Sequence, residues 1–209
     1  GTVFATLKTF GVVLVMAIVM HWFWLSVLFV GTGLALGRSP AMLIKNMLPA
    51  YFTALGTMSS AATIPVALQA SKNNGVSHGI ANFTVPLCAT IHLCGSTITL
   101  VTCATAVMFL SEHLAIPGYG TMLPFIMMLG VIMIAAPGAP GGGVMSALGL
   151  LTSMLGFGEA SIALMIALYL AQDSFGTACN VTGDGVIALW ADRFAQGGEA
   201  QLAPERETA

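Results

Sequence analysis

The sequence predicts an all-α integral membrane protein with spanning helices and two re-entrant helical hairpins arranged as an inverted repeat. Of its 209 residues, 57% are hydrophobic and only 7% are charged, whereas soluble domains carry about 25% charged residues. Several apolar runs are long enough to cross a bilayer core of about 30 Å. Two other apolar stretches are interrupted at their centres, which leaves each half too short to cross alone.

The composition also excludes several classes of protein. A net charge of −2 with six scattered Lys and Arg residues provides no basic surface for nucleic acid. Cys88, Cys94, Cys103 and Cys179 fall in apolar runs without CxxC spacing, so neither a disulfide framework nor a zinc site is predicted. No nucleophile–base pair or cofactor motif stands out, so we expect neither an enzyme nor an organic cofactor. The chain has no initiator Met and no signal peptide, and we expect it to be a fragment or to lack an N-terminal half.

Residues 1–37 are predicted to form the first transmembrane helix, around the apolar run 10–36. His21, Trp22 and Trp24 interrupt the middle of this run. Because Trp prefers the membrane interface, we expect this face to contact protein rather than lipid. We interpret His21 as a hydrogen-bonded helix-packing residue rather than a ligand.

Residues 38–74 are predicted to form the first re-entrant hairpin. Pro40 is well placed to begin a helix, and the stretch 57–65 places small hydroxyl residues at the centre of the segment. Irregular backbone at membrane depth is tolerated only where protein or a water-filled cavity satisfies it. A single kinked spanning helix is the alternative for this segment.

Residues 78–111 are predicted to form a partly unwound spanning helix, because Gly95 lies between polar residues near its middle. Local unwinding there would free backbone carbonyls to bind a cation. Residues 119–156 are predicted to form the second re-entrant hairpin. Two prolines and four glycines in the stretch 137–143 cannot continue a helix.

Residues 159–194 are predicted to form the last spanning helix. It carries Asp173 and Asp184, the only acids deep in any apolar run, and an intramembrane carboxylate marks a functional site by default. Asn180 lies one helical turn before Asp184, and Asp173 lies one turn before Thr177, so each pair shares a helix face. These oxygen-bearing pairs suit a cation and a polar solute; polar contacts between helices are the alternative.

The charges favour two hairpins that do not cross the membrane. With that topology, one side receives five of the six cations, and the positive-inside rule places that side in the cytoplasm. These cations are Arg38, Lys45, Lys72, Arg193 and Arg206, with Lys8, Glu112 and Glu159 on the opposite side. The predicted location is therefore the cytoplasmic (inner) membrane, with residues 195–209 as a disordered cytoplasmic tail. Two broken segments of similar design, one entering from each side, are typical of inverted repeats around a midplane transport site.

Four motifs then carry a resemblance to a known family. They are Met58-Ser59-Ser60-Ala61-Ala62-Thr63-Ile64-Pro65, Pro86-Leu87-Cys88-Ala89-Thr90-Ile91, the loop 137–143, and Asn180-Val181-Thr182-Gly183-Asp184. In this order and spacing they resemble the C-terminal half of the glutamate-transporter family of dicarboxylate/amino acid:cation symporters. The resemblance implies an elevator transport domain with the second hairpin as its outer gate. It also implies a homotrimer held by an N-terminal scaffold that lies outside this chain.

The resemblance also implies roles for individual residues. Asp173 would take the α-amino group of the substrate, and Asn180 would hold the substrate carboxylate, or a sodium ion through its backbone. The implied substrate-binding residues are Ser59, Ser60, Gly138, Ala139, Asp173, Gly176, Thr177 and Asn180. The implied sodium ligands, several of them through backbone carbonyls, are Cys88, Thr90, His92, Met133, Ile134, Ala136, Asn180 and Asp184.

Departures from the family pattern change the expected substrate. Members that carry acidic amino acids have an arginine directly before the position of Thr177, where this chain has Gly176, and no arginine occurs between Arg38 and Arg193. A second substrate carboxylate, buried without a partner, would be strongly unfavourable. We therefore expect a small neutral amino acid of the serine, threonine or alanine type, as in the sodium/serine–threonine branch. The alternatives are a proton- or sodium-coupled dicarboxylate or acidic amino acid carrier, a channel-like leak, and a truncated fragment that does not transport.

The ion site departs from the pattern as well. His92-Leu93-Cys94-Gly95-Ser96 stands where the family usually has Asn-Met-Asp-Gly-Thr, so the side-chain sodium site of that Asn and Asp is expected to be lost. Asp184 still implies one sodium ion, and the carbonyls of the second hairpin allow another. The ordinary histidine side chain titrates near neutral pH, so proton coupling through His92 is a further hypothesis.

Overall fold

The computed structural model describes the backbone of residues 2–202 and the side chains of residues 8–196. Over that part of the chain the fold is all-helical, as the sequence predicts. The helices, in chain order, are α1 (Thr2–Leu36), α2 (Pro40–Thr57), α3 (Ser60–Asn73), α4 (His78–Ile91), α5 (Cys94–Leu110), α6 (Tyr119–Met133), α7 (Gly142–Leu155), α8 (Glu159–Leu170) and α9 (Asp173–Leu202).

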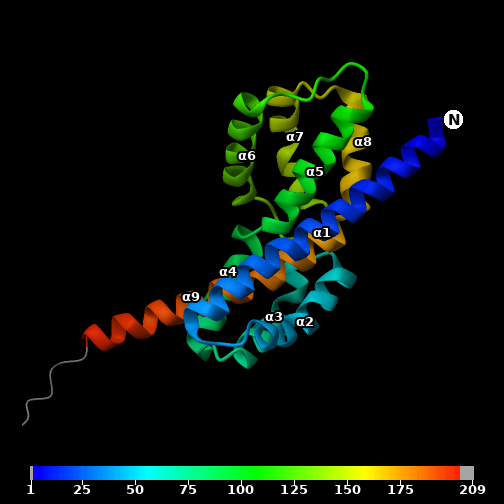
Figure 1. Cartoon of the computed structure of the whole chain (residues 1–209). Helices are drawn as coiled ribbons and strands as arrows, with labels where there is room; N and C mark the ends of the chain where they lie inside the picture. The colour runs from blue at the N-terminus through cyan, green and yellow to red at the C-terminus, as the bar shows by residue number, and fades with distance from the viewer. Residues whose placement is uncertain (1, 203–209) are drawn as a thin grey trace, which may run out of the picture.

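The helices gather in two lobes that α1 and α9 connect (Figure 1). One lobe contains α2, α3 and α4 packed with α9, and its core includes Phe29 and Met47. The other contains α5, α6, α7 and α8, and its core includes Phe125 and Leu151. Helix α5 also packs against α1 and α9, which extend into the other lobe.

Helix α1 packs on protein along a single stripe. The stripe recurs every fourth residue: Val13, Ala17, His21, Leu25 and Phe29. This spacing keeps side chains on one helix face, and the opposite face exposes large apolar residues such as Val19 and Phe23. His21 is buried as predicted, but Trp24, on the same predicted protein-facing side, is 38% exposed in this chain.

Helices α2 and α3 form a hairpin rather than one kinked helix. Asn74, directly after α3, donates to the carbonyl of Leu43 at 3.0 Å and accepts from the side chain of Asn46 at 2.9 Å, so the far ends of the two helices lie together. At the turn, Met58 adopts the left-handed conformation with φ 51°. Ser59 then caps α3 by accepting a hydrogen bond from its first turn.

Helices α6 and α7 form the second hairpin, with the predicted Pro/Gly-rich loop as its turn. Gly141 has φ 74°, a conformation that favours glycine. The two helices contain 15 and 14 residues, fewer than the roughly 20 that a spanning helix requires. That both hairpins re-enter the membrane without crossing it stays a prediction.

The two long helices predicted to carry polar residues near their centres are both interrupted. The segment 78–111 leaves the helix at His92 and Leu93, whereas Gly95, the expected point of unwinding, is helical. Gly95 serves a close helix crossing instead, described below. The segment 159–194, predicted as one helix, bends by 58° between α8 and α9.

Helix α9 also extends beyond its predicted end. It continues to Leu202, so the prediction of a disordered tail from residue 195 is wrong for residues 195–202. These residues include Ala, Gln and Glu, which favour a helix. Residues 203–209 of that predicted tail lie outside the described residues.

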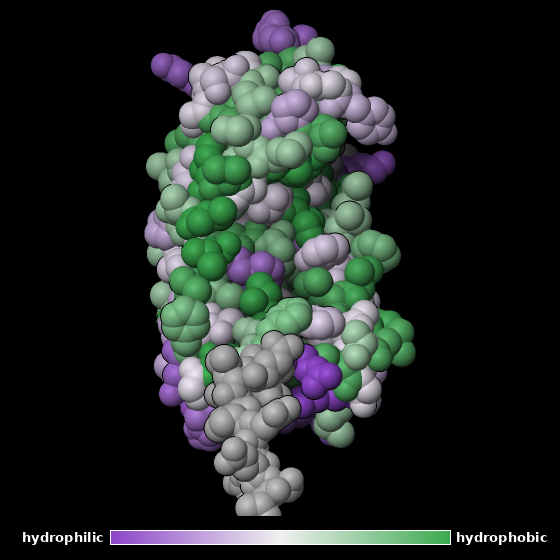
Figure 2. All heavy atoms as spheres, turned by 90° about the vertical axis from the view of Figure 1, so that its left-hand side faces the viewer, coloured by the Kyte–Doolittle hydropathy of each residue, from purple (hydrophilic) through white to green (hydrophobic). Residues whose placement is uncertain are grey.

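The lengths and compositions of the helices fit three membrane crossings. Lys8–Leu36 and His78–Leu110 are each long and apolar enough to span, and α8 with α9 adds a third if the bent pair is one span. Figure 2 shows mostly hydrophobic residues over the middle of one face and hydrophilic residues towards the two ends.

Cationic side chains lie beyond both ends of the apolar part of α1. Lys8 lines a groove together with Phe109 and Ile116, whereas Arg38 and Arg193 line a pocket where the end of α1 meets the C-terminal half of α9. This separation agrees with the charge distribution expected from the sequence. Which end faces the cytoplasm stays a prediction, and Arg206 lies outside the described residues.

Candidate functional site

The candidate site lies where α5 crosses α9, and two glycines allow this close approach. A Cβ on Gly95 would lie 2.3 Å from the carbonyl oxygen of Gly176 and 2.5 Å from Cβ of Cys179. A Cβ on Gly176 would lie 3.0 Å from Oγ1 of Thr99. Gly176 therefore faces α5, and an added Cβ would be in tight contact with it.

Asn180 anchors the start of α5 to α9. Its Oδ1 accepts hydrogen bonds from the backbone N–H groups of Gly95 at 2.7 Å and Ser96 at 3.1 Å, and its Nδ2 donates to Ser96 Oγ at 2.8 Å. The first N–H groups of a helix have no partner within the helix, so this side chain satisfies two of them. The interpretation of Asn180 as a polar contact between helices therefore holds for its side chain. The resemblance also implies that the backbone of Asn180 binds a solute or cation, and that stays a prediction.

Asp173 connects the start of α9 to the tip of the second hairpin. Its Oδ2 accepts a hydrogen bond of 2.7 Å from the backbone N–H of Gly141, and the side chain is 4% exposed. The hydroxyl groups of Tyr169 and Thr177 also interact with this carboxylate. The carboxyl group is thus hydrogen-bonded to the hairpin tip and lies close to hydroxyl groups from α8 and α9.

The tips of the two hairpins touch each other. The carbonyl of Gly138 accepts from Ser59 Oγ at 2.9 Å and from the backbone N–H of Ala61 at 3.2 Å. A Cβ on Gly138 would lie 2.5 Å from the carbonyl of Ala89, so the second tip also lies directly on α4. Glycine is needed at this position because the tip is packed from two sides.

A small cavity remains beneath these tips. Its wall is formed by Met58, Ser60, Leu93, Ser96, Pro137, Gly138, Ala139, Gly143, Tyr169, Asp173, Thr177 and Asn180. Its volume of about 10 Å³ is room for about one water molecule. The hairpin tips must separate before a larger solute can enter.

Most of the predicted substrate-binding residues line this cavity, namely Ser60, Gly138, Ala139, Asp173, Thr177 and Asn180. Ser59 lies beside it, as cap of α3 and partner of Gly138, and Gly176 faces α5 instead. The sequence reasoning missed Tyr169, which is buried and closes one side of the cavity. Its position one turn before Asp173 is the signal that could have found it.

The side chain of Asp184 is in direct polar contact with His92. The two side chains come from α9 and from the break between α4 and α5, and Nδ1 of His92 lies 2.8 Å from Oδ1 of Asp184. Asp184 is 1% exposed. A Cβ on Gly183 would lie 2.8 Å from Cε1 of His92, so the glycine before Asp184 makes space for the imidazole ring.

The other predicted sodium ligands are partly engaged within their own segments. The carbonyl of Cys88 accepts from His92 N–H at 2.9 Å, and that of Met133 accepts from Ala136 N–H at 3.2 Å. Thr90 Oγ1 donates to a carbonyl within α4, and the side chain of Ile134 is 57% exposed. A carbonyl oxygen has two lone pairs, so these bonds leave acceptor capacity for a cation. The second sodium site under the hairpin stays a prediction.

The sequence of this chain is similar to one family model and to several known transporters. The family model described as the sodium:dicarboxylate symporter family matches residues 1–194. The chain is 33% identical over 153 residues to excitatory amino acid transporter 1 of Rattus norvegicus, covering 72% of this chain and 27% of that protein. It is 30% identical over 152 residues to excitatory amino acid transporter 5 of Homo sapiens, again covering 72% and 27%. The chain thus spans about a quarter of the length of these relatives.

Proposed function

The chain belongs to the sodium:dicarboxylate symporter family, and from that premise we propose that it moves a small neutral amino acid together with sodium across the cytoplasmic membrane. Serine, threonine and alanine are the substrates that we expect. The cavity under the two hairpin tips is the substrate site, and Asp184 belongs to the sodium site. The transporters of this family are not enzymes.

The chemistry of the cavity supports a zwitterionic substrate. Asp173 supplies a buried carboxylate for an ammonium group. Ser60 and Gly143 line the same cavity from the first turns of α3 and α7. A helix N-terminus carries partial positive charge and unpaired N–H groups, so two such ends suit a carboxylate. An amino acid provides both groups at once.

The observation that carries the choice of substrate is the charge of the cavity wall. Among the described residues that form this wall, Asp173 is the single charged side chain, and none is Lys or Arg. A second carboxylate on the substrate would enter without a cationic partner, at a large desolvation cost. The crossing at Gly176 supports the same conclusion, because this position carries no side chain and is packed tightly against α5.

Sodium coupling would follow from the closure of the second hairpin. The closed cavity has room for about one water molecule, so substrate exchange requires the tip to lift from Ser59 and Ala61. We expect the closed state of the hairpin to be stable only when both solute and cation are bound. The closed state then binds each of them more tightly when the other is present, and this difference in affinity couples their transport.

We further propose that the chain moves as an elevator domain against a scaffold that forms a homotrimer. The exposed apolar face of α1 supports this, because it offers a long surface to protein or lipid. Its large exposed residues include Val12, Val15, Met16, Val19, Phe23, Val27 and Val30. The predicted inner-membrane location and cytoplasmic C-terminus belong to the same proposal.

A carrier of dicarboxylates or acidic amino acids is the second candidate, favoured by the printed names of the family and of the matched transporters. In that case the helix N-termini of the hairpins would bind the second carboxylate in place of an arginine. The contact of His92 with Asp184 favours a role for protons within either candidate. A fragment without transport activity is the remaining alternative.

Uptake by the protein that carries this chain, reconstituted in proteoliposomes, tests the proposal. Labelled serine, alanine, threonine and aspartate are compared with and without an inward sodium gradient. We expect sodium-dependent uptake of the neutral substrates and its loss in Asp184→Asn. Glu159→Gln, which neutralises an exposed acid at the start of α8, is the matched control.

Each contrary result has its own meaning. Preferred uptake of aspartate would overturn the substrate argument from the cavity wall. Uptake driven by a proton gradient alone would overturn sodium coupling. Full activity of Asp184→Asn would remove Asp184 from the ion site, and no uptake of any substrate would favour the non-transporting fragment.

A further inference from the structure

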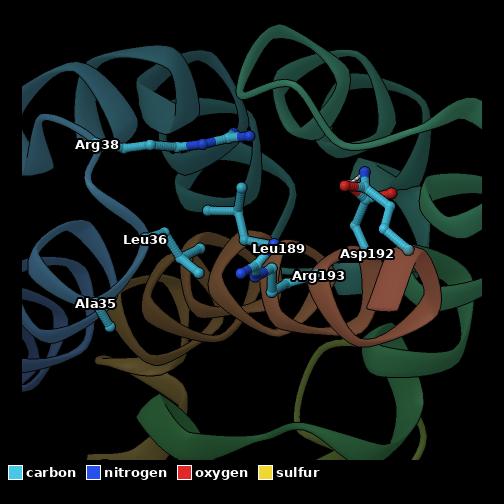
Figure 3. A pocket seen from close by; sticks show the side chains of 7 residues that line it. Ala35, Leu36, Arg38, Leu189, Asp192 and Arg193 are labelled. Atoms are coloured by element: carbon cyan, nitrogen blue, oxygen red, sulfur yellow. Dashed lines mark hydrogen bonds between the residues drawn. The ribbon is translucent and has the colours of Figure 1, made fainter. Parts of the chain in front are cut away.

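A pocket with two arginines lies outside the candidate transport site, at the end of the molecule where α1 stops. Its volume is about 230 Å³. It is lined by Ala35, Leu36, Arg38, Leu189, Asp192, Arg193 and Gln196. Figure 3 shows Arg38 extending from the turn after α1 and Arg193 extending from α9, with Leu36 and Leu189 beside them. The two guanidinium groups thus come from segments far apart in the sequence.

Arg38 is held in place by the turn between α3 and α4. Its Nη1 donates to the carbonyl of Asn74. The guanidinium lies across Gly75, where an added Cβ would be 3.0 Å from Nη1. A guanidinium has five N–H donors in a planar fork, so this contact orients the group and leaves other donors for a ligand.

The acid in the pocket is occupied by other partners. Asp192 is 4% exposed, and its Oδ1 accepts from the backbone N–H of Ser77 at 3.1 Å. Its Oδ2 accepts from the side chain of Gln196 at 2.7 Å. Within residues 8–196, neither Arg38 nor Arg193 forms an ion pair with a carboxylate. The pocket therefore has two positive charges against one negative charge that is already hydrogen-bonded at both oxygens.

We propose that this pocket binds the phosphate group of an anionic phospholipid. Planar guanidinium groups match phosphate oxygens through paired hydrogen bonds. Ala35, Leu36 and Leu189 form the apolar part of the wall. Guanidinium groups beside apolar side chains suit a lipid headgroup with its glycerol group, and basic pockets between helices at the cytoplasmic surface are typical places for such headgroups. A soluble phosphate would use only the polar part.

The test measures binding of three probes to the full protein in neutral detergent. Phosphatidylglycerol, phosphatidylcholine and inorganic phosphate are titrated separately, and bound molecules are counted by native mass spectrometry. We expect a clear preference for phosphatidylglycerol. Arg193→Gln and Arg38→Gln should each weaken its binding roughly fivefold, and the double variant roughly 25-fold, the effect expected of one and two cations at an anionic surface.

Lys45→Gln is the matched control, because it removes an exposed cation of α2 that does not line the pocket. Its binding of phosphatidylglycerol should change less than about twofold. Equal binding of phosphatidylglycerol and phosphatidylcholine would overturn the proposal. So would equal losses in Lys45→Gln and Arg193→Gln, since the effect would then be general surface charge. Displacement of the lipid by inorganic phosphate at similar concentration would assign the pocket to a soluble phosphate compound and overturn the proposal that it binds a phospholipid.

Arg38→Gln removes the bond to Asn74, and this variant can fail for reasons of folding. Arg193 is exposed and lies on the surface of α9, so Arg193→Gln tests the proposal by itself. Unchanged binding of phosphatidylglycerol in a folded Arg193→Gln variant would overturn the assignment. Because the pocket is separate from the cavity, amino acid uptake in detergent-free vesicles of phosphatidylcholine provides an independent reading of the transport function.

Discussion

Nδ1 of His92 lies 2.8 Å from Oδ1 of Asp184, so the side chain from the break between α4 and α5 contacts one oxygen of the most deeply buried acid among the described side chains of α9. The imidazole occupies one acceptor position of this oxygen, so a sodium ion that approaches from the same side competes with it. His92 is therefore a competitor for the cation as well as a neighbour of it.

Replacing His92 tests this competition. We expect His92→Asn to lower the sodium concentration for half-maximal uptake about tenfold, which corresponds to ~1.4 kcal/mol, because Asp184 is then free for the ion. His113→Asn, in the exposed loop after α5, is the control and should leave the value unchanged. An unchanged or higher sodium requirement in His92→Asn would contradict the competition. If the pH dependence of uptake is also unchanged, protons are not coupled through His92.

The crossing of α5 and α9 predicts a severe effect of a single methyl group. In Gly95→Ala the new Cβ would lie 2.3 Å from the carbonyl oxygen of Gly176, so we expect a loss of about 1–3 kcal/mol in the free energy of unfolding. Thermal denaturation in detergent measures it. Gly130→Ala in α6, where an added Cβ meets nothing within 4 Å, should be neutral or slightly stabilising. Equal melting temperatures for the two variants would show that the helices separate at no cost.

Tyr169 should act on substrate binding rather than on folding. Its hydroxyl interacts with Asp173, and it would lie 2.5 Å from a Cβ on Gly143. Tyr169→Phe keeps the ring and removes the hydroxyl, so we expect KM to rise about fivefold, the effect of one lost hydrogen bond, with unchanged melting temperature. The same change at Tyr119, which is 92% exposed, should have no effect on KM. A lower melting temperature with unchanged KM would make Tyr169 a core residue only.

The contact between the hairpin tips predicts an effect on gating. Ser59→Ala removes both the cap of α3 and the 2.9 Å bond to the carbonyl of Gly138. We expect the closed state to weaken by about 1 kcal/mol, which would raise the rate of substrate release about fivefold in an efflux assay. Ser39→Ala removes a cap of the same kind from α2, away from the tips, and should leave the rate as it was. If both variants release substrate equally fast, capping rather than the tip contact is responsible.

The sequence was a good guide where local chemistry decides the structure. The turns at Met58–Ser59 and at residues 137–143 follow from glycines, prolines and capping hydroxyls, and the helix pairs α2–α3 and α6–α7 turn at these positions. Asp173 and Asp184 could be singled out because an acid in an apolar run needs a special environment. Six of the eight substrate residues that the family resemblance implies line the cavity.

Tertiary contacts decide what the sequence could not show. The bend between α8 and α9 has neither Gly nor Pro at its centre, and it accompanies the bond from Gly141 to Asp173. From the sequence alone, Gly95 is interpreted as a point where the helix unwinds. Gly176 is interpreted as the position where other members of the family have an arginine. The structure shows a second cause, since they allow two helices to touch. His92 and Asp184 lie 92 positions apart, and spacing along one helix gives no sign of that pair.

The placement of both buried acids in α9 has a consequence for biogenesis. A ribosome completes the chain from its N-terminus, so His92, Tyr169 and the tip around Gly141 are all synthesised before Asp173 and Asp184 emerge. When each carboxylate reaches the membrane, its partners from other helices and loops are already made, and only Thr177, one turn further along α9, follows Asp173. Insertion therefore never requires an acid to wait for a partner from a segment still to be translated.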